Sequence, residues 1–442
     1  MTQEEVVKRF REDNIKFIQL QFTDLYGVVK SLTIPVESFD NCLRFGTWFD
    51  GSSIEGFCRI AESDMYLKPD LDTYNVIPWL NSDDGNTCRF ICDIYNPDGL
   101  PFEGDPRYIL KRVVAEARSM GYDFKTGPEL EFFLFKKNNQ RIEPNDAGGY
   151  FDLSMDEAYE VRREMTVALE KFGIKVEASH HEVAVGQHEI GFKYDEALKT
   201  ADNAVTFRFV LKAIAGKYGL HATFMPKPIQ GISGSGMHVH QSLFQLNSGE
   251  NVFYDVNHPY NLSPLALNFI AGQLAHIKGM SAILSPTVNS YKRLVSGYEA
   301  PVYISWAKNN RSALIRIPRF AKGNIKATRA ELRSPDPACN IYLSFAVMLA
   351  AGLEGIKNNL IAPQPVEENL YHLDNSCLME RKIETLPGSL WEAIKEMERD
   401  PLIVTALGEH TYKRYLEAKN AEWDEYRLQV TSWEIEKYLA NY

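Results

Sequence analysis

Two glutamates and two histidines in this chain have a spacing that suits metal binding. The run GPELEFF carries Glu129 and Glu131, which point to one side if the segment is extended. Further on, a glycine-rich turn leads into the alternating run MHVHQS, where His238 and His240 share a face in the same way. Two carboxylates side by side in an apolar strand are costly unless a cation lies between them. The pattern therefore predicts a metal site, with an exposed strand face and a solvated hairpin as the simpler alternatives.

A second acidic cluster strengthens this prediction. Glu177 precedes the run HHEVAVGQHE, in which Glu182 and Glu189 flank a glycine turn as hairpin neighbours would. Hard cations such as Mg²⁺ and Mn²⁺ prefer oxygen ligands. Because carboxylates dominate and no cysteine joins the set, zinc is disfavoured. Four glutamates with one or two imidazoles indicate two or three Mg²⁺ or Mn²⁺ ions.

A third cluster is rich in arginine. It comprises the runs NSYKR, NRSALIR and KATRAELR, and in the last of these Arg329, Glu331 and Arg333 alternate onto one face. The planar guanidinium group grips phosphates and carboxylates with two hydrogen bonds. Acids for metals together with arginines for phosphates indicate phosphoryl transfer. The alternative is a set of surface ion pairs, each contributing little.

Composition restricts the class of protein. The chain has 442 residues, is 45% hydrophobic and carries a net charge of −11, which argues against nucleic acid or an anionic membrane as the main partner. The start, MTQEEVVKRFREDN, predicts a charged amphipathic helix and not a signal peptide. No apolar run approaches the length of a membrane span. The six cysteines have no metal-site spacing, so we expect reduced thiols in a cytoplasmic protein.

The order of predicted elements gives two domains. A helix at 3–13 and strand-like segments at 17–22, 28–34 and 89–95 indicate a small, mostly β domain over residues 1–104. Asp105-Pro106 suits a helix start and opens a larger α+β domain over 105–442. Its helices are expected near 106–120, 155–172, 195–218, 263–283 and 338–358, and Ser389 with Glu392 fits a capping box in a helical C-terminal part.

Taken together, these motifs resemble the type I glutamine synthetases of bacteria and archaea. The resemblance spans FDGSSIEGF, GPELEFF, HHEVAVGQHE, KPIQGISGSGMHVHQS, NSYKRLVSGYEAP, NRSALIRIP and ELRSPDPACN in the order of that family. It implies an α+β fold with an N-terminal β-grasp domain and a catalytic domain of the glutamine synthetase/guanido kinase type. It also implies a homo-dodecamer of two hexameric rings with active sites between subunits.

The resemblance also implies an activity, the ATP-dependent ligation of ammonia to L-glutamate through a γ-glutamyl phosphate. The implied metal ligands are Glu131, Glu182 and Glu189 for one ion and Glu129, His238 and Glu331 for a second. The implied ATP contacts are Glu177, Tyr194, Ser242, Arg311, Arg316 and Arg329. The implied substrate contacts are Ser233, Gly234, His240, Arg293 and Arg333. Asp50 of a neighbouring subunit would take the proton from ammonium, Glu299 would lie on a loop closing over the intermediate, and Arg311 would assist catalysis.

Regulation and specificity follow from smaller features. Arg59 resembles a feedback-control arginine of the subgroup without adenylylation, so glutamine, 2-oxoglutarate or PII-type proteins are expected effectors. Tyr371 is interpreted as structural. The family usually has Asn directly before GSGMH, where this chain has Ser233. A γ-glutamyl amine or polyamine ligase of the same fold is therefore an alternative, although the run FDGSS with Asp50 favours ammonia. A catalytically silent regulatory paralogue is the other alternative, disfavoured because the matched glutamates and arginines are present.

Overall fold

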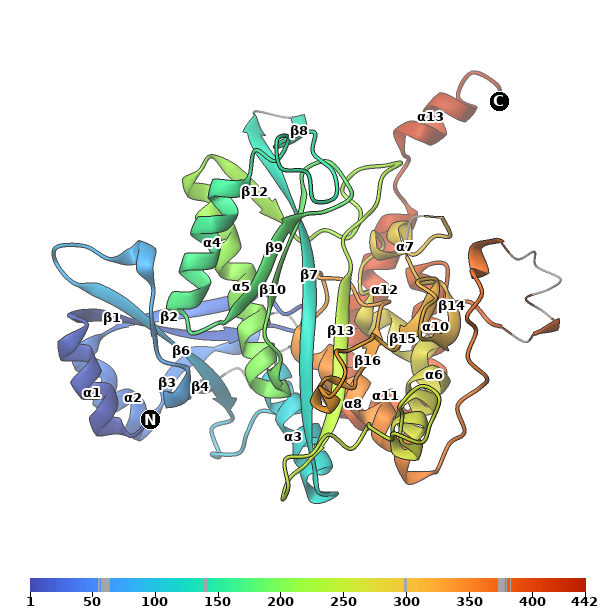
Figure 1. Ribbon diagram of the computed structural model, residues 1–442. Helices are drawn as coiled ribbons and strands as arrows, with labels where there is room; N and C mark the ends of the chain where they lie inside the picture. Colours follow the sequence, from blue (N-terminus) through green and yellow to red (C-terminus); the bar gives the residue numbers. More distant parts are fainter. Residues whose placement is uncertain are drawn as a thin grey trace.

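The computed structural model describes residues 1–54, 56, 64–138, 141–297, 300–372, 378, 380–381 and 383–442. Two mixed β-sheets lie side by side, and the larger one is flanked by helices (Figure 1). Within the residues just given, no helix is both long and apolar enough to cross a membrane.

The first sheet is built from the N-terminal quarter of the chain. Its strand order is β2-β1-β6-β4-β3, and β5 pairs with β6. The predicted hairpin is confirmed, because β1 and β2 pair antiparallel from Phe17–Pro35 to Thr23–Val29, while β6 runs parallel to β1. Helix α1 begins with a capping box between Thr2 and Glu5 and buries one apolar face on the sheet. The elements are α1 (Gln3–Glu12), β1 (Ile15–Thr23), β2 (Val29–Pro35), α2 (Phe39–Phe45), β3 (Thr47–Asp50), β4 (Asp64–Pro69), β5 (Asn75–Val76) and β6 (Asn86–Tyr95).

The second sheet is organised around one long strand, β7 (Tyr122–Asn138), which runs through the centre of Figure 1. The strand order is β14-β15-β16-β13-β7-β10-β9, and β8, β11 and β12 also pair with β7. The partners are β8 (Arg141–Pro144), β9 (Val176–His181), β10 (Gln187–Phe192), β11 (Asp195–Glu196), β12 (Leu220–Thr223), β13 (Met237–Gln245), β14 (Tyr303–Ala307), β15 (Ala313–Arg316) and β16 (Ala330–Leu332). Glu129 and Glu131 lie in the middle of β7, so this strand fixes their position.

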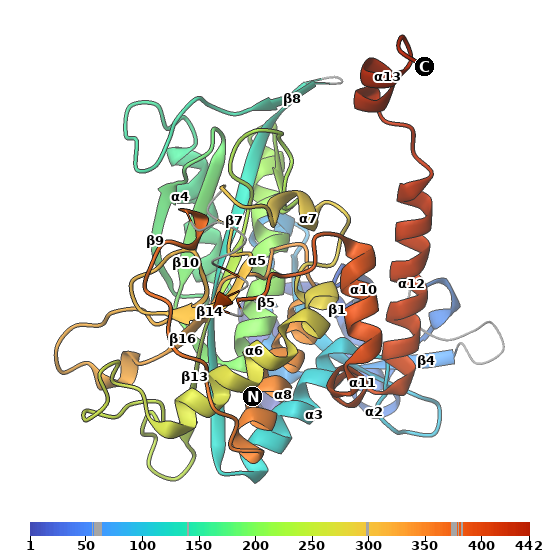
Figure 2. The ribbon, with the colours of Figure 1, turned by 90° about the vertical axis from the view of Figure 1, so that its right-hand side faces the viewer.

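Helices account for much of the remaining chain. They are α3 (Pro106–Ser119), α4 (Tyr159–Lys171), α5 (Ala197–Lys217), α6 (Pro264–Leu284), α7 (Ser290–Arg293), α8 (Ile341–Lys357), α10 (Leu390–Arg399), α11 (Pro401–Leu407), α12 (Glu409–Arg427) and α13 (Ser432–Tyr438). The five with predicted ranges, α3, α4, α5, α6 and α8, match those ranges to within four residues. Helices α6 and α8 pack on each other, and Figure 2 shows α12 and α13 along one side with the C-terminus projecting beyond the body.

Helices α4 and α8 begin later than predicted, and one predicted capping box is incomplete, in each case for a local reason. Helix α4 begins four residues later than expected, because Asp156 bonds the Ala158 N–H (3.1 Å) and pairs with Arg162, which holds the preceding residues in a turn. Helix α8 begins after Asn340, whose side chain caps it. At α10 Ser389 accepts from the Glu392 N–H, but Glu392 accepts from the Gly388 N–H, so the predicted capping box is only half formed.

One buried arginine, Arg107, connects the first sheet to helix α5 of the second. The guanidinium of Arg107 donates to Asp93 (2.7 Å) and Asp70 (2.7 Å) from the first sheet's region, and to Asp202 (3.0 and 2.8 Å) on α5. The Tyr342 hydroxyl also donates to Asp202 (2.7 Å). Arg107 is only 2% exposed, so its charge depends on these partners. The predicted domain boundary near residue 104 stays a prediction.

We expect the Arg107→Ala variant to lose about 3 kcal/mol of unfolding free energy, because three carboxylates would lose their shared cation. Urea unfolding followed by circular dichroism measures this. The matched control is Arg118→Ala on the same helix. The side chain of Arg118 is half exposed, and its pairs with Asp123 and Glu196 should contribute less than about 1 kcal/mol. Equal losses in the two variants would contradict the structural role of Arg107.

Candidate active site

The register of the second sheet places acids and histidines in adjacent rows. Glu129 of β7 lies opposite His238 of β13. Two positions along, Glu131 lies opposite Glu189 of β10, and Glu189 lies opposite His180 of β9. A one-residue slip would turn these side chains to the other face. The strand pairing therefore decides which carboxylates can meet.

The first of two ligand clusters, the Glu129 group, consists of Glu129, His238 and Glu331, whose ligand atoms lie within 4.8 Å of one another. The Nδ1 atom of His238 is 3.7 Å from a carboxylate oxygen of each glutamate. Arg316 (2.9 Å) and Arg333 (3.3 Å) flank Glu331 on its other side. These three residues are the predicted ligands of the second ion.

The second cluster, the Glu182 group, consists of His180, Glu182 and Glu189, again within 4.8 Å. Both glutamates are predicted ligands of the first ion, and His180 is a member that the sequence did not single out. Glu131, the third predicted ligand, faces the same carboxylates. Its Oε2 atom accepts from the Gly236 N–H (3.0 Å) and from Gln187 (2.9 Å).

The electrostatics of the two clusters differ. Burial alone would raise the pKa of Glu129, but hydrogen bonds with His238 and His240 hold that pKa well below its usual range. Burial raises the pKa of Glu131 well above its usual range, and the charges of Glu182 and Glu189 raise it further. The negative charges of Glu131, Glu182 and Glu189 are therefore not fully balanced by nearby positive groups. Hard oxygen donors in such surroundings fit a divalent cation.

A cavity of ≈ 350 Å³ opens beside the Glu129 group. It is lined by several of the predicted ATP contacts and by one member of each ligand cluster, among them Glu177, Tyr194, Ser242, Arg329, His240, Glu129 and Glu189. His240 links the Glu129 group to the predicted phosphate contact Arg329. Its Nε2 atom is 2.8 Å from Glu129, and its Nδ1 atom accepts a hydrogen bond from Arg329 (3.1 Å). Half-exposed Tyr194 offers an aromatic ring at the wall.

A smaller cavity of ≈ 40 Å³ lies on the other side of the ligand clusters. Its lining includes the predicted substrate contacts Ser233, Gly234, Arg293 and Arg333, together with Glu131, Glu182 and His238. Gly234 is required by space, since a Cβ there would lie 2.2 Å from the Pro226 carbonyl oxygen. Arg293 is buried and donates to the carbonyls of Ser334 (2.8 Å) and Pro335 (3.2 Å), which anchors it at this wall.

Family models cover both parts of this architecture. The model described as "Glutamine synthetase, catalytic domain" matches residues 103–438, and "Glutamine synthetase, beta-Grasp domain" matches residues 14–97. The chain belongs to the glutamine synthetase family. The α+β class with an N-terminal β-grasp domain is thereby confirmed.

Full-length relatives agree with the family assignment. The chain is 54% identical to a glutamine synthetase of Thermotoga maritima, with 99% of this chain and 100% of the relative covered. It is 52% identical to a glutamine synthetase of Thermus thermophilus, with 100% and 99% covered.

Solved structures share the fold over the whole length. A structure described as "GmaS/ADP complex-Conformation 1" is 33% identical, with a TM-score of 0.89, and the match covers 98% of this chain and 99% of that chain. The Plasmodium falciparum glutamine synthetase structure is 26% identical, with a TM-score of 0.89, and 99% of each chain is covered.

Two residues matched to family motifs, Asp50 and Arg311, line neither of the two cavities. Asp50 ends β3 in the first sheet and lines neither site cavity, and its Oδ1 atom accepts from the Ser52 N–H (2.8 Å). Arg311 is exposed, and its carbonyl oxygen accepts from Arg333. Glu299 and Arg59 lie outside the described residues. The Tyr371 hydroxyl donates to the Ala300 carbonyl (2.7 Å), which agrees with a structural role.

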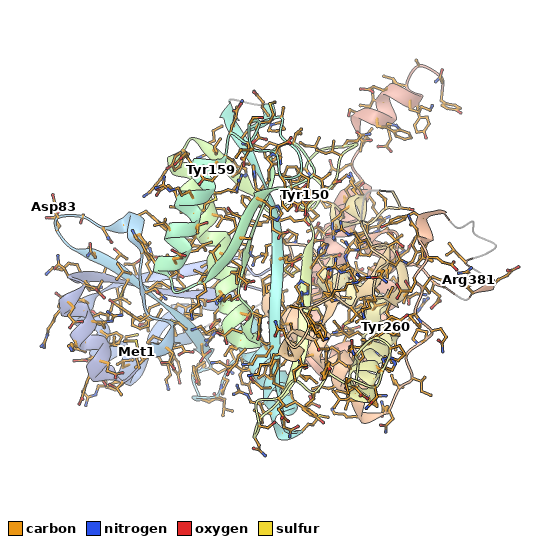
Figure 3. The ribbon with its side chains drawn as sticks, viewed as in Figure 1. Met1, Asp83, Tyr150, Tyr159, Tyr260 and Arg381 are labelled. Carbon is orange, nitrogen blue, oxygen red and sulfur yellow. The ribbon has the colours of Figure 1, made fainter. Side chains whose placement is uncertain are left out.

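The sequence did not predict the role of His180 in the Glu182 group, nor the aromatic residues that cover it. His180 was visible in the run HHE, but only the pairing of β9 with β10 shows that it faces Glu189. Aromatic rings also cover it. Tyr150, labelled in Figure 3 near the upper part of the sheet, stacks on Phe151 (ring centroids 4.0 Å apart), and Phe151 meets His180 edge-on at 4.9 Å.

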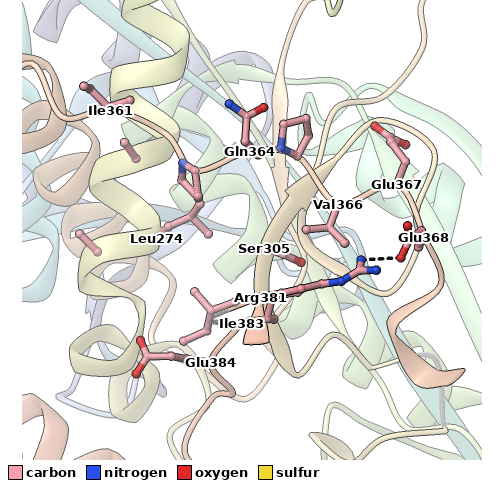
Figure 4. A pocket seen from close by; sticks show the side chains of 15 residues that line it. Leu274, Ser305, Ile361, Gln364, Val366, Glu367, Glu368, Arg381, Ile383 and Glu384 are labelled. Carbon is pink, nitrogen blue, oxygen red and sulfur yellow. Dashed lines mark hydrogen bonds and ion pairs between the residues drawn. The ribbon is translucent and has the colours of Figure 1, made fainter. Parts of the chain in front are cut away.

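A wider cavity of ≈ 860 Å³ is separate from this site. Figure 4 shows its lining by α6, β14, the segment 361–368 and the residues Arg381, Ile383 and Glu384, with Arg381 paired to Glu368. Of the predicted site residues that the structure describes, none lines this cavity. Volume alone therefore does not locate the chemistry.

We expect Arg329→Ala to raise KM for ATP by about tenfold or more, because a charged donor at the nucleotide cavity is lost. KM for glutamate should change less than KM for ATP. The comparison variant is Arg319→Ala, which removes an exposed arginine of the same segment that bonds Asn309 (2.8 Å) and should leave KM for ATP unchanged. A normal KM for ATP in Arg329→Ala would remove this residue from the nucleotide site.

Proposed function

We propose that this chain joins ammonia to L-glutamate with cleavage of ATP, giving L-glutamine, ADP and phosphate. Relatives of about 50% identity over the full length are named glutamine synthetase, and this supports the activity. The observation in the chain itself that carries the proposal is the pair of ligand clusters between two cavities. The larger cavity has room for a nucleotide, and the smaller one is lined by Arg293 and Arg333, whose guanidinium groups can bind carboxylates.

The reaction runs in two balanced steps. An oxygen of the glutamate side-chain carboxylate attacks the γ-phosphorus of ATP, the bond to the ADP oxygen breaks, and γ-glutamyl phosphate forms. Ammonia then attacks the carbonyl carbon, phosphate leaves with the bonding electrons, and the adduct loses a proton. Because ammonium has no lone pair, it must give up a proton before it attacks.

The metal ions would be held by the two clusters. We assign one ion to Glu129, His238 and Glu331, and the other to Glu131, Glu182 and Glu189, with Mg²⁺ or Mn²⁺ as the cation. Bound there, divalent cations neutralise charge on the transferring phosphoryl group. We place ATP in the cavity with Glu177, Tyr194 and Ser242, its phosphates facing Arg311, Arg316 and Arg329.

The substrate side is assigned by the same logic. Arg293 and Arg333 line the small cavity and would position the carboxylates of glutamate, while Ser233 and Gly234 form its wall. His240 lines the larger cavity beside Glu129 and Arg329 and would lie next to the phosphate. Glu299 would help to exclude water from the acyl phosphate, which hydrolysis would otherwise destroy.

Asp50 implies an assembly. Because it lies apart from both cavities of its own chain, we assign it to the site of a neighbouring subunit, where it accepts a proton from ammonium. Helix α13 supports association, since its apolar side chains Trp433 (59%) and Ile435 (48%) are exposed. We infer a homo-dodecamer, which the solution mass tests.

We further propose cytoplasmic location and control by glutamine through Arg59, with 2-oxoglutarate or PII-type proteins as other effectors.

The test is phosphate release by the purified protein with ATP, Mg²⁺ and glutamate. We expect release to require ammonium and to match glutamine formation mole for mole. Methylamine and putrescine, offered in place of ammonium, are the comparison substrates, because Ser233 lines the small cavity. Preference for either amine would replace the proposal by an amine ligase, and no release with any amine or with added 2-oxoglutarate would contradict a ligase.

A further inference from the structure

A third group of possible ligand residues lies directly behind the Glu182 group. It consists of Asp146, His181 and His188, all of them buried. His181 precedes Glu182 in the chain and His188 precedes Glu189. The two histidines face each other across the β9–β10 hairpin, so their rings lie on the opposite side of the strands from Glu189 and His180.

Every ring nitrogen of the two histidines already has a partner. His181 bonds Asp146 through Nε2 (2.9 Å) and the Glu182 carbonyl oxygen through Nδ1 (2.7 Å). His188 accepts at Nδ1 from Arg162 (3.0 Å), which can only donate, and its Nε2 atom therefore donates to Asn145 (3.1 Å). No lone pair is left for a metal ion, so this group is a support and not a third metal centre.

Asp146 joins this network to the turn of the hairpin. Its Oδ1 atom accepts from the Gly186 N–H (3.1 Å), in the turn between Glu182 and Glu189, as well as from His181. Its Oδ2 atom accepts from Asn145 (2.7 Å). One carboxylate thus contacts both the turn and the end of β9, directly before Glu182.

Two glycines, Gly148 and Gly186, allow the segment 144–148 to pack closely against the β9–β10 hairpin. A Cβ at Gly148 would lie 2.9 Å from His181 Nε2, and one at Gly186 would lie 2.9 Å from the Pro144 Cβ. Gly186 also has a φ of +67°, which favours glycine. The segment 144–148 therefore packs on the hairpin without space for adjustment, which restricts the positions open to Glu182 and Glu189.

We propose that Asp146 and His181 are positioning residues that fix the β9–β10 hairpin so that Glu182 and Glu189 converge on one divalent cation. The inference rests on the metal role assigned to these glutamates under the proposed function. Residues behind the ligands of a metal site commonly change its affinity by about 10–100-fold when they are replaced. The Asp146–His181 pair touches only one of the two clusters, so only that cluster should weaken.

The experiment measures Mn²⁺ binding to the full-length protein by calorimetry, without turnover. The background is Glu129→Gln, which removes a ligand of the other cluster so that the remaining binding reports Glu182 and Glu189. Asp146→Asn and His181→Gln in this background should each weaken Mn²⁺ binding by about tenfold or more. His181→Asn keeps a donor near the Glu182 carbonyl and should recover part of the loss.

The matched control is Tyr342→Phe, which removes the buried hydrogen bond to Asp202 (2.7 Å) far from the hairpin. It should lower the melting temperature without changing the dissociation constant for Mn²⁺. If Asp146→Asn and His181→Gln behave like this control, the pair is only structural and the inference is overturned. If the unsubstituted protein itself binds no Mn²⁺, the proposed metal role fails and the inference falls with it, whereas Mn²⁺ binding with no ligase activity contradicts the proposed function alone.

Discussion

The structure depends on one electrostatic constraint, which is that several carboxylates are crowded around the middle of β7. Burying like charges is costly unless cations or donors compensate them. Glu129 and Glu331 receive compensation from His238, Arg316 and Arg333. Fewer positive charges compensate Glu131 and its neighbours Glu182 and Glu189. Burial raises the pKa of Glu131, and the charges of the two neighbours raise it further. This imbalance is the chain's own indication that a cation belongs there.

The rest of the fold serves to keep that crowding in register. β7 pairs with β8, β10, β11, β12 and β13, so its position is fixed over nearly its whole length. The buried network behind the β9–β10 hairpin fixes the neighbouring strands. Arg107 joins the catalytic sheet's helices to the β-grasp sheet, so the two layers share one rigid frame. Stability and ligand geometry are thus parts of one arrangement.

Much of the site could be predicted because strand alternation is a local property. The faces of Glu129, Glu131, His238 and His240 follow from period two, and the hairpin at β1–β2 follows from its turn. The contact between His238 and Glu331 could not be predicted from alternation, because it depends on the pairing of β13 with β16, about ninety residues later in the chain. Motif order in a known family supplied it. The roles assigned to Asp50, Glu299 and Arg59 rest on that resemblance.

The parts that escaped prediction are those set by tertiary contacts. His180 and the Asp146 network need the pairing of β9 with β10 and the fold of residues 144–148. The late start of α4 depends on Asp156 and Arg162, a contact with no periodic signature. Sequence patterns describe which side of an element a residue takes, but not which distant element it meets.

The most direct test of the account is an anomalous-diffraction map of crystals grown with Mn²⁺ and a non-hydrolysable ATP analogue. We predict separate peaks at the two clusters, one contacted by Glu129, His238 and Glu331 and the other by Glu182 and Glu189, with the analogue's phosphates beside both. Clear density for the analogue with no peak at either cluster would contradict the claim that the crowded carboxylates exist to bind cations.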